Sequence, residues 1–397
     1  MKENQTQPYK PRVLFPFVEA GMGHIMPMHS IADAFEKKYG EYCEIIRSRF
    51  YQETKEKPLL RFEHNSAAEA RKYAKSSVYG YLNMFLMNVF SPWILPKIIM
   101  DVYIPGAGKA ARRYMQSLAP DMVVSTHWST GYYAERIKDK PITVQYIPDA
   151  RVIPLWRYPN DYLLISKQSG RDEAIKKYPR RFNEKNCLWT PFAIREDAFD
   201  MPMDKKTQRR ALGLDENKCT VTLMDGGYGV GKTLKIVKKL VALDLPLNVI
   251  AICGNNEKSK NALSALKTGE KLTLKVEGQC NALAYLAASD VLVGKSGAST
   301  VAEATYFGCA IIVSKYATTI ERDNAKYYEE TVQNALKIFN VDEIAKTLQF
   351  WCEDDEELKL LQANAQKVHG EYGSEKTADL LFAFLQEKFP HLREIKV

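Results

Sequence analysis

Short apolar runs alternate with longer amphipathic runs along most of the chain, and this alternation predicts strands connected by helices. In the first half, Arg12 to Val18 predicts a strand, Gly21 to His24 a glycine turn, and the stretch from about Pro27 to Lys38 a helix. Further strands are predicted at residues 43–48, 121–126, 142–147 and 162–166. A second series is predicted at residues 220–224, 248–253, 272–276, 291–293 and 310–314. The expected fold class is therefore α/β, with two doubly wound, Rossmann-like domains facing each other across a cleft.

The division between the two series predicts the domain organisation. The polar stretch from Asp200 to Arg210 is typical of a linker. We expect residues 1–200 to form an N-terminal domain and residues 201–370 a C-terminal domain. Residues 371–397 are expected to form a C-terminal helix that returns to the N-terminal domain.

One segment, residues 78–104, departs from the strand and helix alternation. It is rich in aromatic and large aliphatic residues, its two prolines exclude one straight helix, and lysines and arginines flank it on both sides. This mixture indicates either an interfacial membrane anchor and lipid-acceptor pocket or a pair of core helices. In the first case the membrane contacts would include Phe85, Phe90 and Trp93.

Composition and charge narrow the class of protein. The 397 residues are 46% hydrophobic and 26% charged, which is typical of a globular protein. The net charge of +8 favours an anionic partner, although the sign alone does not choose among phosphorylated substrates, acidic lipids and nucleic acid. The 7 cysteines contain no C-x-x-C pair, which indicates buried thiols in a reducing cytoplasm and no zinc site. We see no signal-peptide core at the N-terminus and no apolar run of the ~18–20 residues needed to cross a bilayer.

The stretch from Gly294 to Ala304 is the first candidate for chemistry. It follows a short apolar strand, opens a helix, and consists mainly of small residues before Glu303. A helix that begins in this way offers unpaired backbone N–H groups and a positive dipole end to phosphate. Glu303 lies about one turn further along, where a carboxylate can accept hydrogen bonds from a diol. These features indicate either a nucleotide site or a helix-capping turn with a surface glutamate.

A second phosphate motif lies earlier in the same half. Residues 226–233 satisfy G-x-x-x-x-G-K-T between a strand and a helix, as a P-loop requires. A P-loop NTPase, however, gives no role to the later phosphate turn or to Gly21–His24, and no downstream strand ends in a clear metal-binding aspartate. We therefore expect Gly226, Gly227 and Gly229 to let the backbone approach a diphosphate or the acceptor across the cleft.

Five blocks of the second half together resemble the donor domain of family 28 glycosyltransferases, which include the diacylglycerol glycosyltransferases and the peptidoglycan GlcNAc transferase that makes lipid II. The blocks are Met224–Gly229, Val249–Asn255, Val276–Gly278 with Leu286–Asp290, Gly294–Ala304, and Glu321–Ala325. The resemblance implies a GT-B fold and inverting transfer from a UDP-sugar, without a divalent metal or a cofactor. The absence of an Asp-x-Asp triplet fits this.

The resemblance also assigns residues to the donor. It implies that the diphosphate is held by Ser296, Gly297, Ala298, Ser299 and Thr300. It places Glu303 at the uridine ribose, and Glu321 and Asn324 at the donor sugar. The chain departs from the family at Ile320, where the family often has glutamine, so the identity of the donor sugar stays open.

In the first half, Gly21 and Gly23 belong to a Gly-x-Gly-His block that matches the acceptor side of the family. A sugar-accepting hydroxyl is a poor nucleophile, so a base within hydrogen-bond reach assists it. His24 titrates near neutrality and follows a strand end, which favours it as that base over a structural role. His127, at the end of another strand, is expected to line the acceptor cleft.

Two further residues are candidates on weaker patterns. Asp149 lies in a divergent form of a lipid-glycosyltransferase block, with Ile153 and Tyr158 where histidines are usual. It is expected either to orient His24 or the acceptor, or to cap a turn. Arg195 ends the stretch Thr190–Arg195, which resembles a Gly-x-Pro-x-Arg segment of the family, and it is expected either to balance diphosphate charge or to be a solvated linker residue.

The predicted protein is a cytoplasmic enzyme, bound peripherally to the anionic inner face of the membrane. It would transfer a hexose from a UDP-sugar to diacylglycerol or a related lipid, with no nucleic-acid partner. The alternatives are a GlcNAc-type transferase acting on a polyprenyl-linked precursor, a UDP-sugar 2-epimerase of the same fold, a P-loop NTPase, and a nucleotide-sugar binding protein without turnover.

Overall fold

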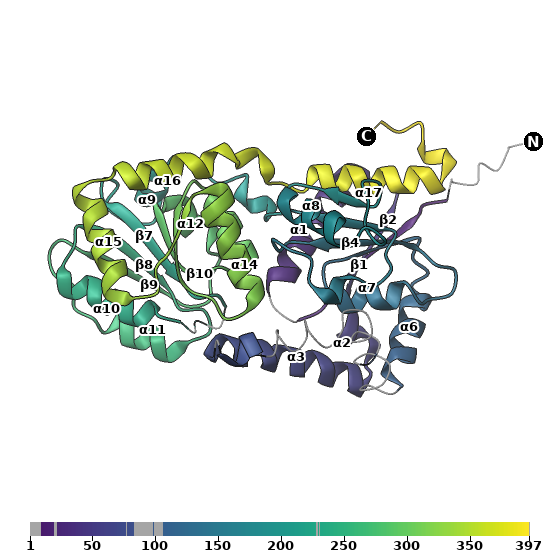
Figure 1. The fold of residues 1–397 in the computed structure, drawn as a ribbon, viewed down its shortest axis with the longest axis horizontal. Helices are drawn as coiled ribbons and strands as arrows, with labels where there is room; N and C mark the ends of the chain where they lie inside the picture. Colours follow the sequence, from purple (N-terminus) through teal and green to yellow (C-terminus); the bar gives the residue numbers. More distant parts are fainter. Residues whose placement is uncertain are drawn as a thin grey trace, which may run out of the picture.

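The computed structural model describes residues 9–19, 22–76, 78–82, 98, 106–227, 229 and 231–396. The chain forms two lobes side by side along its longest axis, each built around one sheet (Figure 1). Every described strand pair is parallel, and helices cover both faces of each sheet. The predicted fold class is confirmed.

The first sheet has the strand order β2-β1-β3-β4-β5-β6. Its strands are β1 (Arg12–Phe17), β2 (Glu44–Arg49), β3 (Met122–Ser125), β4 (Ile142–Ile147), β5 (Tyr162–Ile165) and β6 (Cys187–Trp189). Helices α1 (Met22–Tyr39), α2 (Phe50–Thr54), α3 (Lys57–Lys75), α6 (Ala107–Ser117), α7 (Trp128–Ala134) and α8 (Gln168–Lys177) accompany it.

The second sheet has the strand order β12-β11-β10-β7-β8-β9. Its strands are β7 (Cys219–Met224), β8 (Leu247–Ile252), β9 (Thr273–Glu277), β10 (Val291–Lys295), β11 (Ala310–Lys315) and β12 (Ala335–Lys337). The helices that accompany it are α9 (Lys205–Ala211), α10 (Thr233–Leu243), α11 (Glu257–Ser264), α12 (Leu283–Ala288), α13 (Ala298–Tyr306), α14 (Thr319–Tyr327), α15 (Val341–Glu353) and α16 (Glu356–Lys367).

The predicted strands are all present, with ends that shift by at most two residues, but two strands were missed. These are β6 and β12, which have three residues each and lie at sheet edges. The prediction for the first helix was also wrong at its start, because α1 begins at Met22 and contains Pro27. A proline removes one N–H from the helix ladder, here the bond to the carbonyl of Gly23, and the helix continues on both sides of it. Gly23 and His24 therefore lie in the first turn of α1 rather than in a preceding turn.

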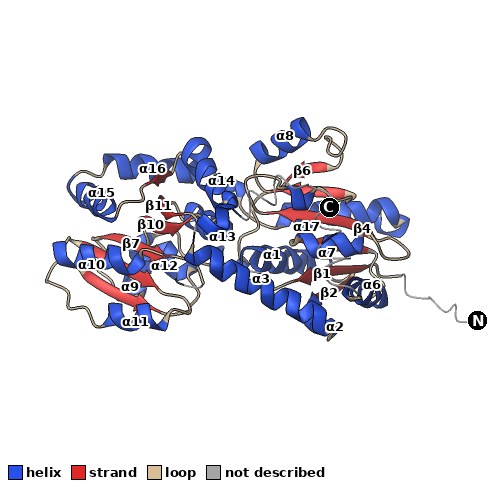
Figure 2. Cartoon of the chain, turned by 60° about the horizontal axis from the view of Figure 1, so that its bottom comes forward, coloured by secondary structure: helices blue, strands red, loops and turns tan. Residues whose placement is uncertain are grey.

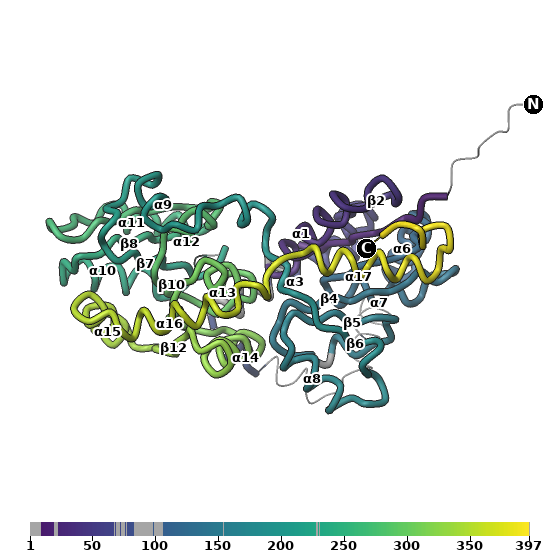
Figure 3. The backbone as a smooth tube through the Cα atoms, turned by 90° about the horizontal axis from the view of Figure 1, so that it is seen from above, coloured from purple at the N-terminus to yellow at the C-terminus, as the bar shows by residue number. Residues whose placement is uncertain are grey.

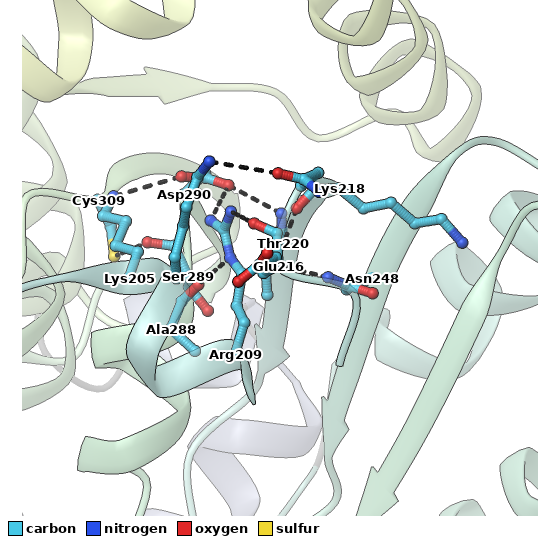
Figure 4. Close-up of polar contacts among 12 residues, drawn as sticks. Lys205, Arg209, Glu216, Lys218, Thr220, Asn248, Ala288, Ser289, Asp290 and Cys309 are labelled. Carbon is cyan, nitrogen blue, oxygen red and sulfur yellow. Dashed lines mark hydrogen bonds and ion pairs between the residues drawn. The ribbon is translucent and has the colours of Figure 1, made fainter. Parts of the chain in front are cut away.

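The stretch predicted as a linker is folded from Lys205 onward. Asp204 caps α9 by accepting hydrogen bonds from the backbone N–H groups of Lys206 and Thr207. Arg209 is buried, donates to the carbonyl of Ala288 at 2.9 Å, and forms an ion pair with Asp290 at the start of β10 (Figure 4). This polar network fastens α9 to the second sheet, which explains why a strongly polar sequence is not a flexible connection.

The end of the chain crosses back to the first lobe. After α16 the chain pairs with Phe192 through the bridge to Tyr372, and helix α17 (Glu375–Lys388) then lies along the first sheet (Figures 1 and 3). The rings of Tyr39 and Phe382 stack with centroids 4.0 Å apart, and the Tyr39 hydroxyl donates to Asp379 at 2.7 Å. The predicted domain limits themselves stay a prediction.

The strand orders determine where a ligand site can form. In the first sheet the order reverses between the neighbouring strands β1 and β3, and in the second between β7 and β10. Loops diverge at the carboxyl ends of such strand pairs and leave a crevice there. The loops after β1, β3, β7 and β10 are therefore the four places where functional residues are expected, and they face the boundary between the lobes.

Helix α3 extends across this boundary. It begins beside α2 in the first lobe and runs along the bottom of the molecule toward the second lobe (Figure 1); when the bottom is turned forward, it crosses in front of the boundary between the lobes (Figure 2). Just beyond its end, the ring of Tyr81 lies 5.9 Å from that of Tyr316 in the second lobe, and the Arg322 guanidinium lies over it. In the described part of the chain, no helix is long and apolar enough to span a membrane.

Candidate functional site

The first lobe brings two histidines together at its strand reversal. His24 lies in the first turn of α1 after β1, and His127 follows β3 and caps α7 by accepting from the backbone N–H of Ser129 at 3.3 Å. Their rings meet edge to face with centroids 5.4 Å apart, and the ring of Trp156 lies 6.1 Å from that of His24. The side chain of Thr126 donates to the carbonyl of His24 at 2.8 Å and fixes this turn.

Burial of these rings favours the neutral form of His24. Burial lowers the pKa of His24, and the carboxylate of Asp149 opposes that shift by raising it. Burial also lowers the pKa of His127 well below its usual value, and a charge on His24 would lower it further. Neutral imidazoles can accept a proton, and His24 Nδ1 is a buried atom without a hydrogen-bond partner among the described residues.

Asp149 follows β4 and faces the second lobe. Burial raises its pKa, whereas His24 and a hydrogen bond from Asn324 lower it. Its carboxylate accepts a hydrogen bond from the side-chain amide of Asn324 at 3.1 Å. Asp149 thus connects the histidine pair to the opposite lobe.

In the second lobe, glycines shape the loop after β7. Gly226 has φ of +75° and Gly229 has φ of +56°, a backbone conformation that glycine adopts without strain. A side chain at Gly229 would lie 1.9 Å from the carbonyl oxygen of Cys253. Gly227 is exposed, and a Cβ there would meet nothing within 4 Å. These glycines let the loop pass close to the loop after β8 and leave open space over Gly227.

The loop after β10 leads directly into α13. Gly297 is the N-cap and supplies no side-chain cap, so the N–H groups of Ala298, Ser299 and Thr300 lack the partner that a serine or aspartate would give. The hydroxyl of Ser299 is also a buried atom without a partner in the described part of the chain. Ser296, in contrast, is fully buried and its hydroxyl donates to the carbonyl of Glu321 at 2.6 Å. The unpartnered donors therefore lie at positions 298–300, and the Ser296 side chain holds α14 against this loop.

Glu303 is buried and carries a contact that we did not predict from the sequence. Its two carboxylate oxygens accept from Arg195 Nε at 2.8 Å and Nη2 at 3.0 Å. Burial raises the pKa of Glu303, and the guanidinium lowers it. Arg195 also donates to Asn281 at 2.7 Å, so it is not a solvated linker residue. Each carboxylate oxygen keeps a second lone pair, which is the acceptor that a ribose hydroxyl would need.

Helix α14 contributes two further predicted residues. Glu321 forms an ion pair with Lys295 at 2.8 Å and accepts from the backbone N–H of Ala317 at 2.7 Å. Asn324 is buried at the boundary between the lobes, where its side-chain oxygen accepts from the backbone N–H of Ala150 at 2.8 Å. Its amide nitrogen donates to Asp149 on the same loop. Asn324 therefore fastens the second lobe to the first, and its predicted contact with a donor sugar stays a prediction.

The described residues of the stretch Gly226–Thr233, which exclude positions 228 and 230, make contacts that differ from those of a P-loop. The Lys232 ammonium donates to the backbone carbonyls of Ser314 at 3.0 Å and Phe339 at 2.5 Å. The Thr233 hydroxyl donates to Asp225 at 2.6 Å, and a Cβ at Gly231 would lie 2.0 Å from that carboxyl group. An acidic side chain thus fills the loop that a P-loop keeps for phosphate, which argues against the NTPase alternative.

Several predicted residues lie outside the described part of the chain. These are Gly21 of the glycine block and the three residues expected at the membrane, Phe85, Phe90 and Trp93. Their predicted roles stay predictions.

Comparison with known proteins agrees with this arrangement. Residues 232–376 match the family model described as the glycosyltransferase family 28 C-terminal domain. A processive diacylglycerol beta-glucosyltransferase of Bacillus pumilus is 24% identical over 370 residues, covering 92% of each protein. The chloroplastic monogalactosyldiacylglycerol synthase of Spinacia oleracea is 24% identical and covers 92% of this chain and 71% of its own length.

Among solved structures, MurG of Acinetobacter baumannii superposes with a TM-score of 0.56 at 16% identity, over 94% of this chain and 99% of its own. This likeness concerns the fold, in which two Rossmann-like domains meet at the carboxyl ends of their sheets. The family model, the sequence relatives and the fold agree: residues 232–376 form a glycosyltransferase family 28 C-terminal domain, and the chain has the GT-B fold of a glycosyltransferase.

Proposed function

We propose that this glycosyltransferase transfers a hexose from a UDP-sugar to diacylglycerol or a related membrane lipid, with inversion and without a divalent metal. The observation that supports the proposal is that the loops at the two strand reversals, β1–β3 in the first lobe and β7–β10 in the second, lie at the same boundary between the lobes. Asn324 bonds the loop of Asp149, which interacts with His24, and Ser296 at the start of α13 bonds α14. A base on one side and unpartnered phosphate donors on the other are the two parts that direct sugar transfer needs.

In this proposal His24 acts on the acceptor. It takes the proton of the acceptor hydroxyl while that oxygen forms a bond to the anomeric carbon and the bond from that carbon to the diphosphate oxygen breaks. One displacement of this kind inverts the anomeric centre. Asp149 supports the resulting imidazolium, since its carboxylate is the charge that raises the pKa of His24.

The leaving UDP gains negative charge as the bond breaks. The free N–H groups of Ala298, Ser299 and Thr300 and the positive end of α13 would stabilise it, as fixed dipoles do in a site that excludes water. This role for the backbone supports a reaction without a divalent ion. Glu303 would accept the two ribose hydroxyls, with Arg195 holding its carboxylate in place.

The lipid acceptor is supported by the sequence relatives and by the surface beside α3. Val78 and Leu82, just after α3, are 79% and 57% exposed. Lys109, Arg113 and Lys138 line a cavity of about 620 Å³ on the same lobe. The exposed apolar side chains and the cations are two separate features of the chain, and each would favour contact with an anionic membrane.

The test is a transfer assay with labelled UDP-glucose, UDP-galactose and UDP-GlcNAc, each offered with vesicles containing either diacylglycerol or a polyprenyl-linked acceptor. We expect a hexose to enter diacylglycerol in the presence of EDTA, with the product bond of opposite anomeric configuration to the donor. Transfer of GlcNAc to the polyprenyl acceptor alone would support the alternative function instead.

The role of His24 is tested in the same assay. His24→Ala should lower kcat by 10²–10⁴-fold, the usual contribution of a general base, while UDP binding stays within about twofold. His64→Ala is the matched control, because His64 is exposed on α3 and has no assigned role. A His24→Ala enzyme with near-normal kcat would exclude the base assignment.

A further inference from the structure

A second basic cavity lies away from the cleft, at the end of α8. It measures about 570 Å³, and its walls include Arg157, Lys177, Tyr178, Arg180 and Arg181. None of the residues that line it is acidic. Helix α8 begins just after β5, on the cleft side, and its ten residues carry the chain about 15 Å toward the opposite edge of the sheet. The cavity is therefore separate from the proposed active site.

Two arginines of this cavity are half-buried, and each has one nitrogen without a hydrogen-bond partner, although Arg157 also donates to the Tyr178 hydroxyl through Nη2. Arg157 Nε and Arg181 Nη2 are buried atoms that lack a hydrogen-bond acceptor among the described residues. Burial lowers the pKa of both side chains, and they are the two described arginines for which this occurs. A buried guanidinium nitrogen without an acceptor costs free energy, because water no longer solvates it.

The neighbouring acids are already engaged. Glu135 acts on Arg181 through its charge, but its carboxylate accepts from the Thr143 hydroxyl at 2.6 Å and pairs with Lys140. Glu184 forms an ion pair with Arg171 instead. The helix end adds a partial negative charge, which Lys176 and Lys177 in the last turn of α8 balance. The cationic character of the cavity thus comes from its three arginines.

The geometry of the cavity suits a flat or tetrahedral oxyanion. The Arg157 guanidinium stacks on the ring of Tyr178 at 3.7 Å, and the Lys177 ammonium lies 5.5 Å from the same ring. Tyr178 thus holds Arg157 in one orientation, with a nitrogen still to be satisfied. Guanidinium groups fixed in this way bind phosphate with several oxygens at once.

We propose that the cavity at the end of α8 is a binding site for a phosphate group, either free or carried on a lipid headgroup, distinct from the nucleotide site. The group would accept hydrogen bonds from the guanidinium groups of Arg157 and Arg181, whose side chains would turn their buried nitrogens toward it, with Arg180 and Lys177 at the exposed rim.

The first test uses inorganic phosphate and the full-length protein. Thermal unfolding is followed in 50 mM phosphate against chloride at equal ionic strength, with saturating UDP present so that the nucleotide site is occupied. The wild type should show a phosphate-specific rise in melting temperature, and Arg157→Gln/Arg181→Gln should lose most of it. Lys238→Gln/Lys267→Gln, which removes two exposed cations from the second lobe, should keep the full rise. Equal rises in the wild type and the arginine variant, or no rise in the wild type, would overturn the proposal.

The second test distinguishes the sources of the phosphate. Pelleting is compared on vesicles of phosphatidylglycerol and of phosphatidylcholine, with and without 50 mM phosphate. For a lipid headgroup, phosphate and the double substitution should each lower pelleting on phosphatidylglycerol at least threefold more than the control pair does. For free phosphate, pelleting should be unchanged although the thermal response is lost. Should the double variant not fold, Arg180→Glu places a carboxylate at the exposed rim and should reduce the phosphate response in the same way.

Discussion

At the scale of single residues, the contact between Glu303 and Arg195 is the clearest feature that the structure shows and the sequence did not predict. The two residues are 108 positions apart, and each was predicted separately to meet the donor. Only the folded chain shows that they meet each other, because α13 and the segment between β6 and α9, which contains Arg195, lie next to each other at the lobe boundary. The sequence motifs pointed to each residue separately and could not reveal that the two form a pair.

This pair leads to a prediction about nucleotide affinity. Glu303→Gln keeps the size of the side chain but removes the charge that orients it, so the dissociation constant for UDP should rise at least tenfold, or ~1.4 kcal/mol. Calorimetric titration with UDP measures this. Glu353→Gln, at an exposed position of α15, is the control, and unchanged UDP affinity in Glu303→Gln would contradict the ribose assignment.

Lys167 is a second residue whose environment the sequence did not reveal. It is buried at the lobe boundary, donates to the Tyr328 hydroxyl at 3.1 Å, and lies within 6 Å of the rings of Phe192, Tyr327, Tyr328 and Tyr372. Burial lowers its pKa to about 7, although the charges of Glu371 and Asp149 oppose the shift.

The lowered pKa predicts how stability depends on pH. Between pH 7 and about 10 the unfolded chain holds a proton on Lys167 that the folded chain releases, so this residue makes stability rise with pH by up to about 1.4 kcal/mol per unit. Below pH 7 both states are protonated and its contribution is constant. Urea unfolding at pH 7, 8 and 9 should show this extra slope in the wild type and not in Lys167→Met. If the free energy of unfolding changed equally with pH in the two proteins, the buried position of the Lys167 amine would be contradicted.

At the scale of elements, the longer strands were predictable because several consecutive apolar residues mark each of them in the sequence. The two edge strands have only three residues each and carry no such pattern. The start of α1 and the helix α9 were misjudged for local reasons. Pro27 suggested that a helix begins there, whereas it lies inside α1 and removes only one hydrogen bond. The charged residues of α9 suggested a solvent-exposed linker, whereas Arg209 forms a buried ion pair with Asp290.

The segment that follows α3 gives the prediction for membrane binding. Val78→Ser/Leu82→Ser should reduce pelleting on phosphatidylglycerol vesicles containing diacylglycerol at least threefold, because both side chains are exposed beside the lobe boundary. Phe350→Ser/Leu360→Ser removes comparably exposed side chains from the second lobe and should pellet like the wild type. Equal pelleting of all three proteins would show that this segment is not a membrane contact.

At the scale of the whole molecule, the sequence predicted two doubly wound domains but not the strand orders. Those orders put the reversals at β1–β3 and β7–β10, and hence put His24, His127 and the loops after β7 and β10 at one boundary. Which strands become neighbours depends on packing between distant segments, so the meeting of these loops had to come from the structure.

Asn324 provides the prediction at this scale. Its amide bonds the carboxylate of Asp149 and the backbone N–H of Ala150, so Asn324→Ala leaves both groups unpaired at the boundary. A lost hydrogen bond to a charged group is worth about 1.5–3 kcal/mol, so the ratio of closed to open lobes should fall roughly 10- to 100-fold. Small-angle scattering should show a larger radius of gyration and the transfer assay a lower kcat. Arg151→Ala, which removes an exposed contact to Asp323 across the same boundary, should change both much less. An unchanged radius and kcat in Asn324→Ala would contradict the coupling of the lobes.

The central claim is lipid glycosylation from a UDP-hexose, and one measurement tests it most directly. Purified protein is incubated with tritiated UDP-glucose or UDP-galactose and diacylglycerol vesicles, and the label in the organic phase is counted against the His24→Ala protein. We predict that label from one of the two donors moves into a chromatographically defined hexosyl-diacylglycerol, and that His24→Ala abolishes at least 99% of this transfer. Label that stays in the aqueous phase with both donors, in a protein that binds UDP normally, would contradict the claim.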